Sequence, residues 1–559
     1  MKRNLNFSHR RLSVLLALGI GACSGDPALD AALDTINAAD LLADIQTLSS
    51  DEFEGRAPSS PGEEKTIEFL KTEFEKLGLE PGNGESFFQE VPLVVITADP
   101  NTTLEIRGNG ARNTFSSGED FVAGTKRVVT QSGISNSELV FIGYGAVAPE
   151  YDWNDWAGAD LRGKTVVVLV NDPGFATGDP DLFNGRTMTY YGRWTYKYEE
   201  GARQGVAGLF VVHETEPASY PWAVVQRGWS GPEFGLVAED NNMSRAAIEG
   251  WWSVETARAV FAQAGLSYDS LKTLAHQRGF SPVPLGLTAS VSVRNTIERS
   301  TSRNVLAVLP GSDRADEYFV YMAHWDHFGL GTPVDGDAIY NGALDNATGT
   351  AALLELAEAF ASLPERPSRS ILFLAVTAEE QGLLGSEYYG QNPVYPLAKT
   401  VAVLNMDVLN VEGRMNDISI IGYGNSELDD YLIEFATAQG REVKSDPNPE
   451  AGSYYRSDHF NFAKVGVPAL YPGNGVDHVE HGEAWTREIR DSWRANQYHQ
   501  PSDEYSSDWD LTGAIDDLLL YFRIGYRIAN ESTFPNWSEG SEFRALRDAM
   551  MGGEGGDLR

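Results

Sequence analysis

The sequence has few of the residues that several classes of protein require. It contains one cysteine, Cys23, in 559 residues, so the rest of the chain can build neither a disulfide framework nor a thiolate metal site. Lys and Arg number 43 against 80 Asp and Glu, which gives a formal net charge of −37. Nucleic acid and anionic membranes would repel such a chain because both are polyanions. We therefore expect no nucleic-acid partner.

Long apolar runs are also missing. Residues 12–21 are apolar but number only about 10, whereas a folded membrane-spanning helix needs about 20. A basic segment precedes them and Cys23 follows them, so residues 1–23 resemble a bacterial lipoprotein signal. The resemblance implies lipidation of Cys23 and an exported cell-envelope protein of a Gram-negative bacterium, in the outer membrane or periplasm or released from the cell. Its membrane contact would be the lipid anchor alone; an ordinary secretory signal is the alternative.

The rest of the amino-acid composition is typical of a loop-rich globular protein with several domains. Hydrophobic residues make up 42% of the chain, which also has 56 glycines. Apolar patterning and turn residues predict the boundaries. We expect a linker at 24–38, the first part of the main domain at 39–130, an inserted domain at 131–290, the rest of the main domain at 291–535 and a tail at 536–559.

The insert and the main domain differ in amino-acid composition and in the pattern of their predicted strands and helices. The insert is rich in Gly, Trp and Tyr, and a helix separates its strands KTVVVLV (164–170) and AGLFVV (207–212). It resembles a protease-associated (PA) domain, a β-rich, non-catalytic unit inserted in a host enzyme. From about residue 295, short apolar strands alternate with helices such as 349–363. That alternation predicts an α/β fold with a mixed, mostly parallel sheet flanked by helices.

Acidic and histidine side chains directly follow three of the predicted strands of the main domain. They are His324, Asp326, Glu379, Glu380 and Asp407. The carboxyl ends of parallel strands meet at one edge of a sheet, where ligands bind. Imidazole and carboxylate are donors that divalent zinc prefers, and a pair of ions needs a bridging carboxylate and a further carboxylate to move protons. We therefore expect a two-metal hydrolytic site at this edge.

The order of these motifs resembles that of the M28 family of metallopeptidases. The order is H-x-D, a Gly-rich turn with Asp-Asn, Glu-Glu, Met-Asp and a late Tyr-His, within residues 300–505; segment 50–64 also resembles the family's opening. The resemblance implies a zinc exopeptidase fold, two Zn²⁺ ions per chain and Glu379 as the general base. It implies as metal ligands His324, Asp345 (bridging), Glu380, Asp407 and His499.

Two carboxylates are expected to support the ligating histidines. A histidine that binds a metal usually donates its other N–H to a carboxylate. Asp326 lies two residues after His324, and Asp503 lies four residues after His499. We therefore expect Asp326 to orient His324 and Asp503 to orient His499.

Other residues near the motifs are given pocket roles. Tyr498 resembles the family's oxyanion-stabilising tyrosine, and simple packing is the alternative. Asp458 and His459 are expected to form a pocket wall and not to bind metal. The remaining candidates are expected to be structural or polar loop residues: His213, His327, Asp335, Asp337, His478 and His481.

The M28 resemblance implies an exopeptidase that removes amino-terminal residues from peptides through a metal-bridging hydroxide, with Glu379 as base. Two alternatives share the fold. One is a carboxypeptidase for acidic dipeptides, which would need arginines for the substrate carboxylate, with Arg456, Arg487, Arg490 and Arg494 as candidates. The other is glutaminyl cyclase, which works with one zinc. From a different class, the chain would be a catalytically silent surface lipoprotein that captures peptides.

Overall fold

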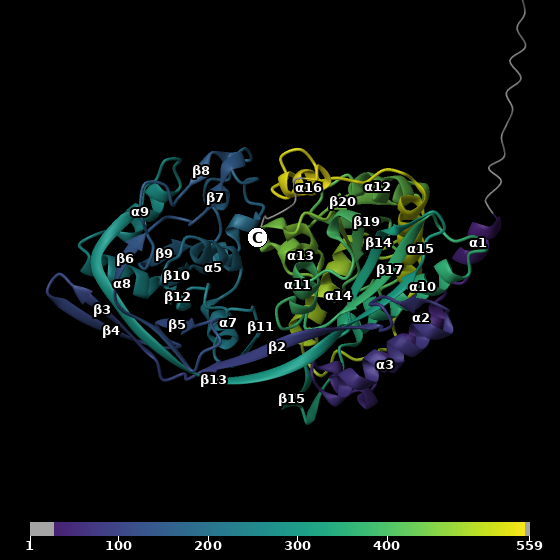
Figure 1. Cartoon of the computed structure of the whole chain (residues 1–559), viewed down its shortest axis with the longest axis horizontal. Coiled ribbons are helices and arrows are strands. Elements are labelled where there is room, and N and C mark those ends of the chain that lie inside the picture. The colour runs from purple at the N-terminus through teal and green to yellow at the C-terminus, as the bar shows by residue number, and fades with distance from the viewer. Residues whose placement is uncertain (1–26, 554–559) are drawn as a thin grey trace, which may run out of the picture.

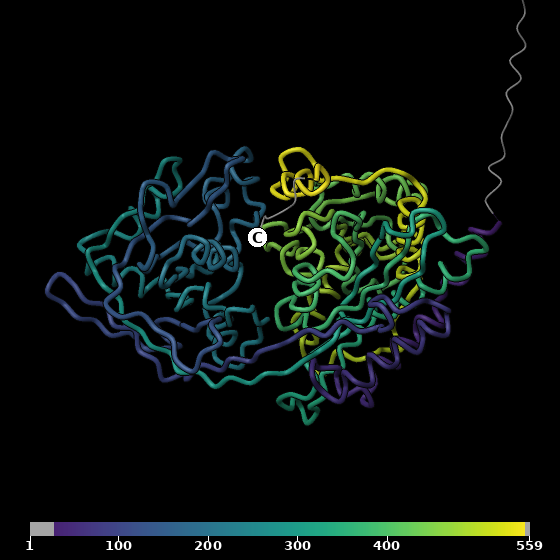
Figure 2. Tube along the Cα trace, in the orientation of Figure 1, coloured from purple at the N-terminus to yellow at the C-terminus, as the bar shows by residue number. Residues whose placement is uncertain are grey.

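The computed structural model describes residues 27–553, which form two lobes joined at one side (Figures 1 and 2). We call residues 27–98 and 295–553 the body, and residues 99–294 the insert lobe. The predicted signal, with Cys23, lies outside the described residues. Within 27–553, no helix is both long and apolar enough to cross a membrane.

The body is built on a mixed sheet whose centre is parallel. Its parallel strands are, in order, β17 (Arg369–Val376), β14 (Arg314–His324), β18 (Thr400–Asn405) and β21 (Ala469–Gly473). Its outer strands are β2 (Phe88–Ala98) and β13 (Val283–Leu309) beside β17, and β19 (Asp417–Ile421) and β20 (Glu442–Ser445) beside β21. A strand of the insert lobe, β11 (Pro232–Leu236), extends this sheet by pairing with β2. This arrangement confirms the predicted α/β fold.

Helices cover both faces of the body sheet because alternate strand residues point to opposite sides. Phe319 and Tyr321 of β14 belong to the core under one group of helices, and Val320 and Met322 belong to the core under the other. The first group includes α2 (Ala38–Leu48), α3 (Pro61–Lys76), α10 (Thr348–Ala361), α12 (Leu428–Ala438) and α15 (Thr512–Asn530). The second group contains α11 (Leu384–Gln391) and α13 (His459–Lys464). Three further helices of the body are α1 (Pro27–Leu33), α14 (Gly482–Asn496) and α16 (Arg544–Met551).

The insert lobe has its own sheet and its own hydrophobic cores. Its strands are β3 (Thr103–Gly108), β4 (Ala111–Ser116), β5 (Phe121–Gly124), β6 (Gln131–Phe141), β9 (Thr165–Leu169), β10 (Gly208–His213) and β12 (Ile248–Ser253). Its longer helices are α5 (Trp194–Arg203), α7 (Trp222–Gly228), α8 (Val254–Gln263) and α9 (Tyr268–Ala275). The lobe includes β3, β4 and β5, which precede residue 131, where the sequence predicts the PA-like domain to start. The PA assignment itself stays a prediction.

One strand, β13, takes part in the sheets of both lobes. Its first part pairs with β3 and β6 of the insert lobe, and its second part, from Asn295, pairs with β2 and then with β17 of the body. Figure 1 shows β13 and β2 running together from one lobe to the other. The two lobes are therefore joined by a pair of hydrogen-bonded strands, β2 and β13.

Helix α15 packs against the sheet through a position that only glycine can occupy. A Cβ atom at Gly525 would overlap the hydroxyl group of Tyr321, which donates a 2.8 Å hydrogen bond to the carbonyl of Tyr521. We predict that Gly525→Ala lowers the free energy of unfolding of the body by about 1–3 kcal/mol because it overpacks a dense core. Calorimetric unfolding measures this. Gly228→Ala is the matched control, since a Cβ there meets nothing within 4 Å; equal effects of the two changes would refute the packing argument.

Candidate metal centre

Three site segments meet at the carboxyl edge of the parallel strands. His324 is the last residue of β14, Asp407 follows β18, and Glu379 and Glu380 follow β17. Asp345 reaches the same place from the turn before α10, residues 343–347. The common direction of the parallel strands thus collects side chains that are far apart in the sequence, as the strand pattern predicts.

Asp345 lies between two histidines. Its Oδ1 is 3.3 Å from Nε2 of His324, and its Oδ2 is 3.3 Å from Nε2 of His499. The same nitrogen of His324 is 3.5 Å from Oδ1 of Asp407, and that of His499 is 3.2 Å from Oε2 of Glu380. One carboxylate therefore joins two groups of donors, with one oxygen turned toward each. The five residues expected to bind metal are together.

The donor atoms fit divalent cations. Three of them, His324 Nε2, His499 Nε2 and Glu380 Oε1, are buried without a hydrogen-bond partner within 27–553. Ligand atoms of His324, Glu379 and Asp407 lie within 4.8 Å of one another, and so do those of His327, Asp345 and Glu380. Carboxylates this close and this buried repel one another unless a cation lies between them. A mixed imidazole and carboxylate set suits zinc.

Glu379 and Glu380 are adjacent but differ in their contacts. Glu380 contacts His499 and His327, whereas the carboxylate of Glu379 accepts no hydrogen bond from the described residues and lies near His324 and Asp407. Burial raises the pKa of Glu379, and Asp407 adds to this effect while His324 opposes it. Glu379 therefore has the environment of a proton acceptor beside the metal site.

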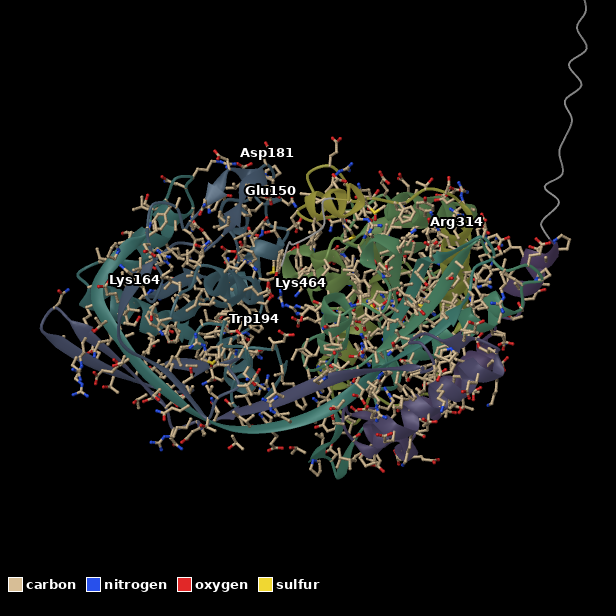
Figure 3. The ribbon with its side chains drawn as sticks, viewed as in Figure 1. Glu150, Lys164, Asp181, Trp194, Arg314 and Lys464 are labelled. Atoms are coloured by element: carbon tan, nitrogen blue, oxygen red, sulfur yellow. The ribbon has the colours of Figure 1, made fainter. Side chains whose placement is uncertain are left out.

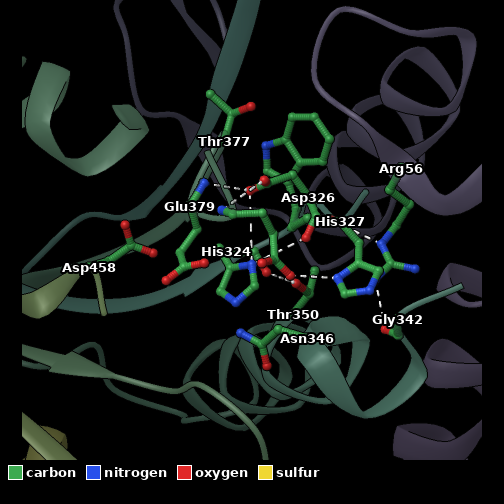
Figure 4. Close-up of polar contacts among 12 residues, drawn as sticks. Arg56, His324, Asp326, His327, Gly342, Asn346, Thr350, Thr377, Glu379 and Asp458 are labelled. Carbon is green, nitrogen blue, oxygen red and sulfur yellow. Dashed lines mark hydrogen bonds and ion pairs between the residues drawn. The ribbon is translucent and has the colours of Figure 1, made fainter. Parts of the chain in front are cut away.

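The two supporting aspartates accept hydrogen bonds from backbone N–H groups, and Asp326 also lies near the ring of His324. Nδ1 of His324 is 3.2 Å from the backbone carbonyl of Asp326 and 3.9 Å from its carboxylate. That carboxylate accepts the backbone N–H group of Glu379 at 3.0 Å (Figure 4). It also accepts the backbone N–H group of Glu380 at 3.4 Å. Asp326 thereby fixes the turn that presents both glutamates.

Asp503 fixes the backbone of Asp345, the expected bridging ligand, in the same way. Its carboxylate accepts the backbone N–H groups of Leu344 and Asp345, each at 3.1 Å. No hydrogen bond between Asp503 and His499 is found in the described part of the chain. The pKa of Asp503 is raised to about 7, mainly by burial. The expected contact to His499 is replaced by one that positions Asp345.

Two of the predicted pocket residues, Tyr498 and Asp458, lie near candidate metal ligands. Tyr498 is 43% exposed, and its ring centroid is 3.7 Å from that of His499, so it lies beside a ligand at the open side. Asp458 is buried; its Oδ1 accepts a 2.6 Å hydrogen bond from Ser386, and its Oδ2 has no partner among residues 27–553. His459 packs against Tyr454 and Tyr471, and its place in a pocket wall stays a prediction.

Two buried residues of the site were not predicted. His327 was expected to be a loop residue, yet it is fully buried, with Nδ1 2.6 Å from Oε1 of Glu380. Arg56 is 1% exposed and donates to the carbonyls of Leu48, Trp325, Asn341 and Gly342. Burial lowers the pKa of Arg56 to about 10, while Asp503 and Asp326 oppose that shift. The sequence signals were the second histidine of H-x-D-H and the arginine of segment 50–64.

The arginines proposed for a substrate carboxylate are not gathered at one place. Arg487 pairs with Glu483 at 3.8 Å, Arg490 with Glu412 at 3.0 Å and Arg494 with Asp491 at 3.1 Å. Arg456 alone of the four makes no ion pair or hydrogen bond through its side chain within the described residues. The other loop candidates stay outside the centre; Asp337, for example, caps its own hairpin strand β16 (Asp337–Tyr340).

Comparison with known proteins agrees with the motif order. Residues 304–523 match the model of Peptidase family M28, and this segment contains every candidate ligand. The mouse protein "Aminopeptidase NAALADL1" is 36% identical over 138 residues, 23% of this chain and 17% of that protein. A probable glutamate carboxypeptidase of Arabidopsis thaliana is 32% identical over 369 residues, 61% of this chain and 47% of that protein. The chain spans less than half the length of these curated relatives.

Solved structures with a related outline include two bacterial aminopeptidases. The aminopeptidase from Aneurinibacillus sp. strain AM-1 is 18% identical, with a TM-score of 0.49, over 90% of this chain and 97% of that one. BSAP, a zinc aminopeptidase from Bacillus subtilis, is 17% identical, with a TM-score of 0.41, over 91% of this chain and 98% of that one.

The cluster predicts that divalent zinc stabilises the folded protein. At a free concentration one hundred times its Kd, an ion that binds only the folded state adds about 2.7 kcal/mol. We expect zinc to raise the thermal midpoint of the metal-stripped protein, and Asp345→Asn to remove most of this rise because both donor groups lose their shared charge. Asp337→Asn, an equivalent change outside the cluster, should keep it. An unchanged rise in Asp345→Asn would show that zinc binds elsewhere.

Proposed function

We propose that the protein is a two-zinc aminopeptidase of the M28 type, which removes residues from the amino terminus of peptides. The observation that carries the proposal is the placement of Asp345, whose two oxygens face His324 and His499. A bridging carboxylate between two donor groups is the arrangement that a pair of metal ions needs. The match of residues 304–523 to the M28 model supports the same conclusion.

The donors divide into two sets around Asp345. His324 and Asp407 would hold one ion, and Glu380 and His499 would hold the other. His327 contacts the carboxylate of Glu380. Two zinc ions held there would polarise the peptide carbonyl and acidify a water molecule. Because the set is complete on both sides of Asp345, it favours two ions over the single zinc of a glutaminyl cyclase.

Glu379 would act as the general base. It lies beside His324 and Asp407, and its carboxylate is free of hydrogen bonds from the described residues. In this role it takes the proton of the attacking water and later gives it to the leaving amine. Asp326 supports the step by fixing the backbone of Glu379, so the carboxylate need not reorganise during the reaction. Tyr498, beside His499, is placed to donate to the carbonyl oxygen.

The charge of the pocket supports action at the amino end of a peptide. Asp458 lies near Glu379, and its buried Oδ2 has no hydrogen-bond partner among residues 27–553. Burial raises the pKa of Asp458 to about 7, and His324 opposes that shift. An unpaired buried carboxyl beside other carboxylates would accept hydrogen bonds from an ammonium group. A free amino terminus therefore fits here better than a carboxylate does.

We predict that Glu379→Gln lowers kcat by about 10² to 10⁴, the usual contribution of general acid–base catalysis, and leaves bound zinc unchanged. Aminoacyl-nitroanilide hydrolysis measures the rate and elemental analysis measures the zinc. Glu387→Gln is the matched control, because Glu387 hydrogen-bonds Gln391 along α11. A Glu379→Gln enzyme with the wild-type rate would remove Glu379 from the mechanism.

The direction of attack gives a second prediction. Acetylating the amino group of a dipeptide removes the charge that the carboxylates bind, so we expect kcat/KM to fall at least about a hundredfold. The same dipeptide with an amidated carboxyl end should still be cleaved. Quantifying the released amino acid from both compounds decides the direction. If the enzyme cleaved the acetylated dipeptide and did not cleave the amidated one, it would instead be a carboxypeptidase.

A further inference from the structure

The two adjacent glutamates of the site lie in a short loop that closes on itself. The loop comprises residues 377–385, from the end of β17 into the first turn of α11, and we call it the base loop. The backbone N–H of Gly385 donates to the carbonyl of Thr377 at 2.9 Å. The two ends of the base loop therefore lie side by side, with both glutamates between them.

Two residues of the base loop adopt a backbone conformation that favours glycine. Ala378 has a φ angle of 55°, and Leu383 has a φ angle of 63°. Residues with a Cβ atom rarely adopt this region, because the Cβ crowds the following carbonyl oxygen. Such conformations persist only where the surrounding structure holds them. The base loop therefore depends on contacts from other segments of the chain.

The side chain of Asn304, on β13, joins both ends of the base loop. Its Oδ1 accepts the backbone N–H of Thr377 at 3.0 Å, and its Nδ2 donates to the carbonyl of Gly385 at 2.9 Å. Asn304 is 0% exposed, so water does not compete for these hydrogen bonds. A Cβ atom at Gly385 would lie 2.5 Å from Oδ1 of Asn304, so the loop approaches the amide as closely as glycine allows.

Asn304 continues the pairing of two strands through its side chain. The antiparallel pairing of β13 with β17 ends at Val305 and Ala375. Asn304 directly precedes Val305, and Thr377 directly follows β17. An asparagine amide offers an acceptor and a donor, as a peptide group does. The amide of Asn304 therefore takes the place of a backbone partner for the base loop.

Other contacts hold the middle of the base loop. Asp326 accepts the backbone N–H of Glu379 at 3.0 Å, as Figure 4 shows. Nδ2 of Asn461, on α13, donates to the carbonyl of Leu383 at 2.8 Å. Figure 3 labels Lys464, the last residue of α13, on the side of the body that faces the insert lobe. Within the described residues, the asparagine of β13 is the one side chain that hydrogen-bonds the backbone of both loop ends.

We propose that Asn304 is a positioning residue for the general base, because its two hydrogen bonds to the base loop set the place of the Glu379 carboxylate. The proposal rests on the proposed function, in which Glu379 takes the proton of the attacking water. A general base must lie within hydrogen-bond reach of that proton, and a displacement of about 1 Å can cost about a hundredfold in rate. Within residues 27–553, Asn304 hydrogen-bonds none of the candidate metal ligands, so it acts through the loop.

Asn304→Leu tests the proposal because leucine has a similar size and makes neither hydrogen bond. With the zinc-loaded full chain, we expect kcat for an aminoacyl-nitroanilide to fall about ten- to a hundredfold and KM to change less than about twofold. Asn304→Asp should retain more of kcat than Asn304→Leu, because its carboxyl group still accepts the N–H of Thr377. A wild-type kcat in Asn304→Leu would overturn the proposal.

Gln89→Leu is the matched control. Oε1 of Gln89 accepts the remaining hydrogen bond of the Asn304 amide at 3.1 Å, so this change removes a buried polar partner and leaves both bonds to the base loop. It should keep the wild-type kcat even if it lowers the thermal midpoint. An equal loss of kcat in Gln89→Leu and Asn304→Leu would show a general loss of packing and refute the positioning role.

A double-mutant cycle shows whether Asn304 acts through Glu379. If it does, adding Asn304→Leu to Glu379→Gln should lower kcat by less than about twofold, because the base is already lost. Independent, multiplied losses would place the effect of Asn304 elsewhere and overturn the proposal. Elemental analysis should find the wild-type zinc content in Asn304→Leu; loss of zinc would assign the effect to Glu380 and refute a role in placing the base.

Hydrogen exchange separates this proposal from the proposed function. In Asn304→Leu, backbone amides of residues 377–385 should exchange at least about tenfold faster than in the wild type, measured by mass spectrometry, while Gln89→Leu should keep the wild-type rate. Unchanged exchange in Asn304→Leu would refute the role of Asn304, whatever the activity. Faster exchange in a protein whose wild type hydrolyses no peptide would refute the aminopeptidase function and keep the hold of Asn304 on the base loop.

Discussion

Repulsion between buried carboxylates is the constraint on which the rest of the structure depends. Asp345, Glu379, Glu380 and Asp407 meet at one sheet edge, and burial makes the charges of Glu379 and Glu380 costly. The chain supplies few compensating cations there, namely the neighbouring histidines and Arg56. Arg56 donates hydrogen bonds to backbone carbonyls of the loops that carry His327 and Asp345. Divalent ions offset the remaining charge best, so the same arrangement that costs stability creates the affinity for metal. Asp326 and Asp503 accept backbone N–H groups and keep the repelling side chains in place.

The insert lobe and the body share the long strand β13, which pairs with β6 in the insert lobe and with β2 in the body. The insert lobe supplies none of the candidate metal ligands, all of which lie in the body.

Much of the centre could be predicted from sequence because strands and metal donors leave local signals. A short apolar run that ends in His324, or in Glu379 and Glu380, predicts both a strand and the position of the donors at its end. Partners that depend on three-dimensional packing could not be predicted. Asp326 is close to His324 in sequence, yet its carboxylate turns to the backbone of the Glu379 segment. Sequence spacing likewise says nothing of the burial of Arg56, since this follows from how distant segments pack.

Anomalous X-ray scattering at the zinc edge, from crystals of the zinc-loaded protein, tests the central claim most directly. The account predicts two peaks on either side of the Asp345 carboxylate, about 3.5–4 Å apart, as in two-metal hydrolases. One peak should contact His324 and Asp407, and the other should contact Glu380 and His499. A single peak, or two peaks that do not share Asp345, would contradict the claim that this carboxylate bridges two ions.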